Sequence, residues 1–161
     1  MLGPMVNPSF PKKQLVGVFS MELARLYGYL YQEMEGRFSI LHAIDGYDEI
    51  SLTGPFKMIS NHGEKLLNPE NLGLSKISAE SIAGGSTVEE SAKIFENILK
   101  GKGTKSQNAV VTANAAAALV TAREGLNFLD AVALAEEVLL SGKALSVFRG
   151  LVNPKTTVSL A

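Results

Sequence analysis

Two short apolar runs, separated by a segment of helical length, constrain the fold of this chain more than any other feature. The first run is Leu15–Phe19, and the second lies near residues 39–44 and begins with Ile40 and Leu41. Continuous apolar runs of this length are typical of strands that are buried on both faces. Between them, Ser20 offers an N-cap, and apolar residues recur at helical spacing as far as Gly36. The pattern predicts a right-handed βαβ unit with two parallel strands.

The segments after this unit predict an antiparallel appendage and then a helical half. Residues 49–53 and 56–60 have the pattern of short strands, and Asn61-His62-Gly63 is a hairpin turn that leads into a further strand. Beyond residue 84, capping residues and glycine stops delimit helices, including an alanine-rich helix over 108–122 that should be buried. We therefore expect an α/β fold with a mostly parallel central sheet, an antiparallel appendage and a covering of α-helices.

Three carboxylates gather where the second apolar run stops. These are Asp45, Asp48 and Glu49, in a turn that contains Gly46. Ligands of open α/β sheets bind at the carboxyl ends of parallel strands, so these acids are well placed to hold a hard cation such as Mg2+. Mg2+ takes one or two protein carboxylates and is completed by substrate phosphate oxygens, which makes a polyphosphate the natural partner. The alternative is a solvated turn, because Asp and Gly gather in turns; the spacing does not fit a calcium-binding loop.

Composition narrows the classes of protein that remain. The 161 residues, 46% of them hydrophobic, suit one domain with a substantial core. A net charge of −1, with both signs mixed along the sequence, argues against a nucleic-acid-binding face. The absence of cysteine excludes disulfides, thiolate catalysis and Cys-based zinc sites, and no apolar run is long enough to span a bilayer. We expect a cytoplasmic protein with neither nucleic-acid nor membrane partners.

Two further motifs have a structural and a functional interpretation. His42 and His62 have no third metal ligand near them in the sequence, so a structural role is favoured over a zinc site for both. Gly84-Gly85 precedes a predicted helix, whose free amides favour anions, and this arrangement is able to cradle phosphate. A capping box formed by Ser86 with Glu89, or by Thr87 with Glu90, is the favoured interpretation there.

Several segments, taken in order, resemble the C-terminal half of anthranilate phosphoribosyltransferase. The likeness runs across nearly the whole chain, although each segment is short, and it is carried by Leu2–Pro8, Gln14–Val18, His42 through Gly54, Asn71–Leu74, Gly84-Gly85 with Glu89-Glu90, and Asn114–Ala116. Members of this family transfer the phosphoribosyl group of phosphoribosyl pyrophosphate to the amino group of anthranilate in tryptophan biosynthesis, release pyrophosphate and require Mg2+. The resemblance implies the same substrates and cofactor here, and a homodimer when the protein is complete.

The resemblance also implies particular site residues. The family's Asp-Glu pair before Ile-Ser-Leu binds Mg2+ and corresponds to Asp48 and Glu49, whereas Gly3 and Pro4 match the Gly-Pro that borders the anthranilate channel. The implied mechanism is electrostatic: the metal neutralises the departing pyrophosphate while the C1 carbon of the ribose becomes cation-like. Asp48 and Glu49 would then position metal and would not transfer protons.

The chain departs from the family pattern in ways that bear on activity. The family's N-terminal helical domain and its glycine-rich loop for phosphoribosyl pyrophosphate have no counterpart in residues 1–161, and Met1 falls inside the opening motif. His42-Ala43 stands where many members carry His-Gly. We therefore expect residues 1–161 to form the C-terminal α/β domain of a longer phosphoribosyltransferase, inactive in isolation. The alternatives are a domain of a pyrimidine nucleoside phosphorylase and a non-catalytic α/β binding domain.

Overall fold

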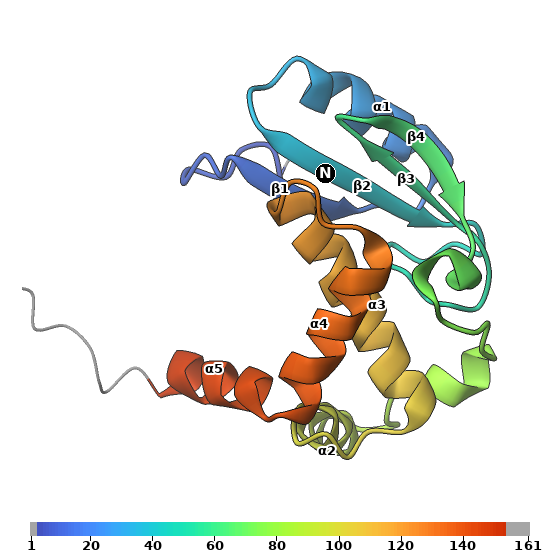
Figure 1. The fold of residues 1–161 in the computed structure, drawn as a ribbon, viewed down its shortest axis with the longest axis vertical. Helices are drawn as coiled ribbons and strands as arrows, with labels where there is room; N and C mark the ends of the chain where they lie inside the picture. The colour runs from blue at the N-terminus through green and yellow to red at the C-terminus, as the bar shows by residue number, and fades with distance from the viewer. Residues whose placement is uncertain (1–2, 154–161) are drawn as a thin grey trace, which may run out of the picture.

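A computed structural model describes residues 3–153 of the chain, which contain four strands and five α-helices (Figure 1). From the sequence we also expect a tail over residues 155–161, which lies outside the described residues. In chain order the elements are β1 (Lys13–Gly17), α1 (Met21–Gln32), β2 (Arg37–Ala43), β3 (Phe56–Ser60), β4 (Gly63–Leu67), the 3-10 turns η1 (Pro69–Leu72) and η2 (Ala79–Ile82), α2 (Val88–Leu99), α3 (Lys105–Ala122), α4 (Phe128–Leu140) and α5 (Lys143–Val152).

The four strands form one mixed sheet in the order β1-β2-β3-β4. β1 pairs in parallel with β2, whereas β3 is antiparallel to both β2 and β4. The expected α/β class and antiparallel appendage are confirmed. The expectation of a mostly parallel sheet is corrected, because within the described residues the hairpin supplies half of the strands and only one pair is parallel.

The segment 49–53 is not a strand, contrary to the sequence prediction. Ile50 and Leu52 are apolar and fully buried, and they alternate with polar residues. This alternation is what suggested a strand. Leu52 nevertheless has a positive φ of 60°, and the backbone amide of Ile50 donates to the side chain of Asn114 and not to a neighbouring strand. The segment is therefore an ordered loop, and the backbone of Ile50 is bound by a distant helix and not by a neighbouring strand.

β2 separates two hydrophobic clusters, because its successive side chains point to opposite faces of the sheet. Phe38 and Ile40 pack with α1 on one face, together with Tyr27 and Tyr31. Leu41 and Ala43 pack on the other face, where α3 covers the sheet (Figure 1). Every residue of β2 from Phe38 to Ala43 is buried, as the apolar run predicts.

α3 lies close to the sheet because its contact positions are small. Ala113, Ala116 and Ala117 are fully buried between the sheet and α4, as the alanine-rich sequence predicts. The hydroxyls of Thr121 on α3 and Ser39 on β2 form a buried hydrogen bond of 2.8 Å, which satisfies two polar groups inside this contact.

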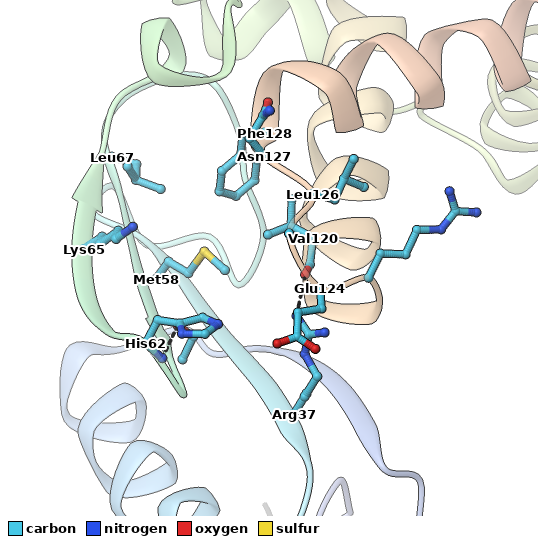
Figure 2. Close-up of a pocket in the computed structure, with 13 residues that line it drawn as sticks. Arg37, Met58, His62, Lys65, Leu67, Val120, Glu124, Leu126, Asn127 and Phe128 are labelled. Atoms are coloured by element: carbon cyan, nitrogen blue, oxygen red, sulfur yellow. Dashed lines mark hydrogen bonds between the residues drawn. The ribbon is translucent and has the colours of Figure 1, made fainter.

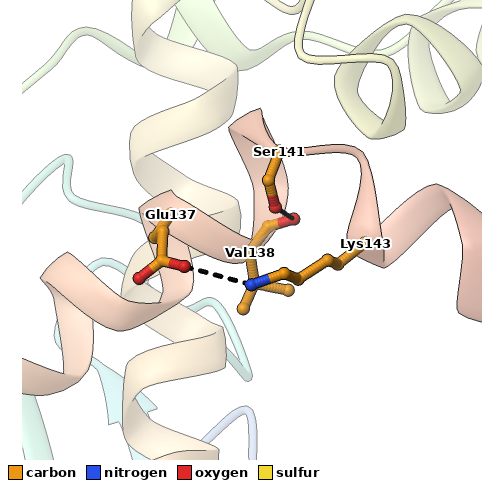
Figure 3. A network of polar contacts seen from close by, with 4 residues as sticks. All are labelled: Glu137, Val138, Ser141 and Lys143. Atoms are coloured by element: carbon orange, nitrogen blue, oxygen red, sulfur yellow. Dashed lines mark hydrogen bonds and ion pairs between the residues drawn. The ribbon is translucent and has the colours of Figure 1, made fainter.

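α2 and α5 do not cover the sheet and have their main contacts with α4, so the helical covering is smaller than expected (Figure 1). Phe95 of α2 and Phe148 of α5 meet edge to face with their ring centroids 5.0 Å apart. Between α4 and α5 the chain turns at Gly142, whose φ is 76°, and the ammonium of Lys143 lies 3.1 Å from the carboxylate of Glu137 (Figure 3). Both side chains are exposed, so this ion pair contributes little stability.

Within residues 3–153, no helix combines the length and the apolar character needed to cross a lipid bilayer.

Candidate functional site

The acidic turn directly follows the carboxyl end of β2. The amide of Gly46 donates to the carbonyl of Ala43 at 2.9 Å, and the amide of Ala43 donates to the carbonyl of Tyr47 at 2.9 Å. These bonds reverse the chain, and Gly46 adopts a φ of 104°, which favours glycine. Asp45, Asp48 and Glu49 are all exposed around this turn.

The three carboxylates have different roles within the turn. The carboxylate of Asp45 accepts a hydrogen bond from the hydroxyl of Thr53 and lies 3.5 Å from the hydroxyl of Ser51. The two hydroxyls are themselves 2.7 Å apart. Asp45 therefore closes the loop between β2 and β3, and its carboxylate is less available to a ligand.

Asp48 and Glu49 are the available carboxylates. Neither side chain makes a hydrogen bond or an ion pair with any other residue in the described part of the chain. Residues 3–153 also contain no group of three or more His, Cys, Asp or Glu side chains that is arranged to hold a metal. Two free carboxylates without a third ligand fit Mg2+, which keeps several waters and takes oxygens from a bound phosphate.

Asn114 of α3 holds the backbone beside this pair. Its amide oxygen accepts from the amide of Ile50 at 2.9 Å, and its amide nitrogen donates to the carbonyl of the same residue at 2.9 Å. The same nitrogen donates to the carbonyl of Val110, which fixes the orientation of the side chain. Since Ile50 follows Glu49 directly, this two-point contact sets the position of the acidic pair relative to α3.

Gly17, at the carboxyl end of β1, contacts the other side of the pair. A β-carbon placed on Gly17 would overlap the backbone carbonyl of Asp48, so only glycine allows this close approach. Gly17 also lies at one end of an open groove of about 440 Å³ along β1, and Pro4 lines the same groove. Gly3 and Pro4 are exposed. The groove along β1 therefore has Pro4 in its lining and Gly17, the neighbour of Asp48, at the carboxyl end of the strand, whereas Gly3 is not among the residues that line it.

Two of the remaining sequence candidates, His42 and the Gly84-Gly85 segment, have structural partners, whereas the ring of His62 makes no hydrogen bond or ion pair within the described residues. His42 is buried, and its Nδ1 donates to the carbonyl of Val18 at 2.9 Å. At the start of α2, the carboxylate of Glu90 accepts from the amide and the hydroxyl of Ser86, and these bonds hold the pKa of Glu90 below its usual value. Thr87 caps the helix through the amide of Glu90. The helix N-terminus that follows Gly84-Gly85 is therefore occupied by the protein's own carboxylate.

Comparisons with known proteins agree on one family. The family described as glycosyl transferase family, a/b domain, matches residues 1–145. An anthranilate phosphoribosyltransferase of Flavobacterium johnsoniae is 55% identical over 151 residues, which are 94% of this chain and 46% of that protein. The chain spans about half the length of the curated relatives that it matches.

Solved structures agree with the sequence relatives. The crystal structure of anthranilate phosphoribosyltransferase from Thermus thermophilus superposes with a TM-score of 0.84 and 31% identity, covering 92% of this chain and 44% of that chain. A variant of the Saccharomyces cerevisiae enzyme with Mg bound superposes with a TM-score of 0.77 and 25% identity, covering 90% of this chain and 44% of that chain.

Asn114→Asp should destabilise the fold. The substitution keeps the shape of the side chain but replaces the donor to the Ile50 and Val110 carbonyls with a charged acceptor, which we expect to cost about 1–3 kcal/mol in the free energy of unfolding. Urea unfolding measures this change. Asn97→Asp introduces the same charge at an exposed position of α2, where the side chain makes no hydrogen bond to any described residue, and should change stability little. Equal effects of the two substitutions would refute the role given to Asn114.

Gly17→Ala should also destabilise the fold, because the added methyl group must displace the backbone at Asp48. Overpacking of this kind costs about 1–3 kcal/mol. Gly150→Ala in α5 is the matched control: a β-carbon there meets no atom of residues 3–153 within 4 Å. It should stabilise the helix by up to about 1 kcal/mol. Thermal unfolding, monitored by circular dichroism, measures both changes: the midpoint temperature should fall for Gly17→Ala and rise for Gly150→Ala.

Proposed function

Because this chain belongs to the glycosyl transferase family, a/b domain, we propose that it is the C-terminal α/β part of an anthranilate phosphoribosyltransferase. Its substrates are then phosphoribosyl pyrophosphate and anthranilate, and its cofactor is Mg2+. The single observation that carries the metal role is the pair of exposed carboxylates, Asp48 and Glu49, which follow β2 and have no partner among residues 3–153. The relative with Mg bound supports the choice of cation.

In this proposal the chain contributes positioning and electrostatics. Asp48 and Glu49 hold the cation, which supplies positive charge to the pyrophosphate as it leaves. Asn114 and Gly17 fix the backbone on the two sides of the pair, so little reorganisation is needed when the diphosphate departs. The role of the two carboxylates is to position the metal and not to transfer a proton.

Gly3 and Pro4 are proposed to border the anthranilate side of the site. The support for Pro4 is the groove along β1, which it lines together with Gly17, the neighbour of Asp48. Gly3 is included because it precedes Pro4 in the matching motif. The homodimer, the cytoplasmic location, and the assignment of residues 1–161 as one domain of a longer enzyme stay predictions of the same proposal.

Asp48→Asn and Glu49→Gln, each made in the complete enzyme, should lower kcat/KM by at least about 100-fold and raise the Mg2+ concentration needed for half-maximal rate. The physical reason is the loss of anionic oxygens that bind the cation. Steady-state rates over a Mg2+ titration measure both effects. Glu70→Gln, at an exposed site outside the acidic turn, is the control and should leave both unchanged. An unchanged dependence of the rate on Mg2+ concentration in the two site variants would refute the proposal.

The 161-residue chain alone should show no turnover. Catalysis of this kind depends on holding donor and acceptor together, and the family's loop for phosphoribosyl pyrophosphate has no counterpart in these residues. The fluorescence of anthranilate, incubated with phosphoribosyl pyrophosphate and Mg2+, follows the reaction. Adding the complementary half of a relative should restore part of the rate; turnover by the chain alone would contradict this prediction.

A further inference from the structure

A second cavity lies at the opposite end of β2 from the acidic turn. It has a volume of about 470 Å³ and opens between the β3–β4 hairpin and the junction of α3 with α4 (Figure 2). Arg37, the first residue of β2, lines it, whereas the acidic turn begins after Ala43, the last residue of the strand. The volume is within the range of small-molecule sites, roughly 300–1,000 Å³. None of the residues of the proposed phosphoribosyltransferase site lines this cavity.

One wall of the cavity is apolar because of the register of the hairpin. Met58 pairs with Lys65, and Phe56 pairs with Leu67, so Met58, Lys65 and Leu67 lie on the same face of the hairpin. Phe128, the first residue of α4, lies across the cavity from Leu67 (Figure 2). A sulfur-containing, an aliphatic and an aromatic side chain therefore offer an apolar surface to the body of a ligand.

The same cavity contains cationic groups without partners. Within residues 3–153, the ammonium of Lys65 and the ring of His62 make no hydrogen bond or ion pair, and both side chains are directed into the space between the hairpin and the helices (Figure 2). On the opposite face of the hairpin, by contrast, Lys57 forms a 2.6 Å ion pair with Glu64. The hairpin thus neutralises its lysine on one face and leaves a lysine unpaired on the face that lines the cavity.

The balance of charge in the lining favours an anion. Arg37 and Lys65 carry permanent positive charges, and Glu124 is the opposing carboxylate. Arg37 uses one guanidinium nitrogen on the carbonyl of Val120, at 3.3 Å, and keeps its other donors. Glu124 forms no ion pair with any of these cations in the described residues, so it does not cancel the charge of a particular partner.

We propose that this cavity binds a small amphipathic anion, an apolar body that carries one carboxylate or phosphate group. The body contacts Met58, Leu67 and Phe128, and the anionic group lies at Lys65 and His62. A purely protective role for Lys65 is the competing explanation, because inward-pointing lysines on edge strands such as β4 prevent strand-to-strand association. That explanation predicts no saturable binding of an anion in the cavity.

The test is a titration of the 161-residue protein, labelled with 13C at its methionine methyl groups, with 1-naphthoate. Ring currents of a bound naphthyl group should shift the methyl signal of Met58 saturably, whereas Met21 and Met34, which do not line the cavity, should stay unshifted. The neutral isostere 1-naphthamide should bind at least about three-fold more weakly, as expected for the loss of one partly exposed charge contact.

Matched variants separate charge recognition from general apolar binding. Lys65→Gln should weaken binding of 1-naphthoate by roughly three- to five-fold. Lys76→Gln, an exposed lysine outside the cavity, should leave it unchanged. Three results would each overturn the proposal: no saturable shift at Met58, equal affinity for the acid and the amide, or equal affinity of the two lysine variants. The proposal is independent of phosphoribosyl transfer, because neither Asp48 nor Glu49 takes part in it.

Discussion

The burial of β2 on both faces is the constraint on which the rest of this structure depends. A strand covered on both sides needs one layer for each face, and α1 and α3 supply these layers. The strand leaves the sheet at Ala43, where the side chains turn from wholly buried to exposed within one residue. Acidic residues are therefore tolerated from Asp45 onward and excluded before it, and this boundary places the carboxylates at the edge of the sheet.

The loop that carries the acidic pair gains its shape from contacts on both sides. Asn114 binds Ile50 from α3, and Gly17 contacts Asp48 from β1. Leu52, although its φ is 60°, is held by complete burial and by the hydrogen bond from Ile77 to its carbonyl. A left-handed conformation of a non-glycine residue costs about 1–3 kcal/mol, and packing offsets that cost here. Support of this kind fixes the backbone of the loop that carries Asp48 and Glu49.

The parts of this architecture that follow from short-range patterns could be predicted, and the parts that depend on distant residues could not. The βαβ unit and the hairpin turn at Asn61-His62-Gly63 follow from local periodicity and turn chemistry. The loop at 49–53 was mistaken for a strand because its hydrogen-bond partner, Asn114, lies 64 residues away. The start of α3 at Lys105 had a readable signal, since Thr104 and Gln107 form a capping box, and the prediction placed this start three residues too late.

The two ends of β2 differ in the sign of the charged side chains around them, although the net charge of the whole chain is close to zero. The overall charge of −1 arises from similar numbers of acids and bases. The fold nevertheless sets exposed carboxylates after Ala43 and unpaired cations around Arg37. Six residue steps of a strand separate these ends by about 20 Å, roughly twice the screening length at physiological salt. A cation at the one proposed site and an anion at the other would therefore have little direct electrostatic influence on each other.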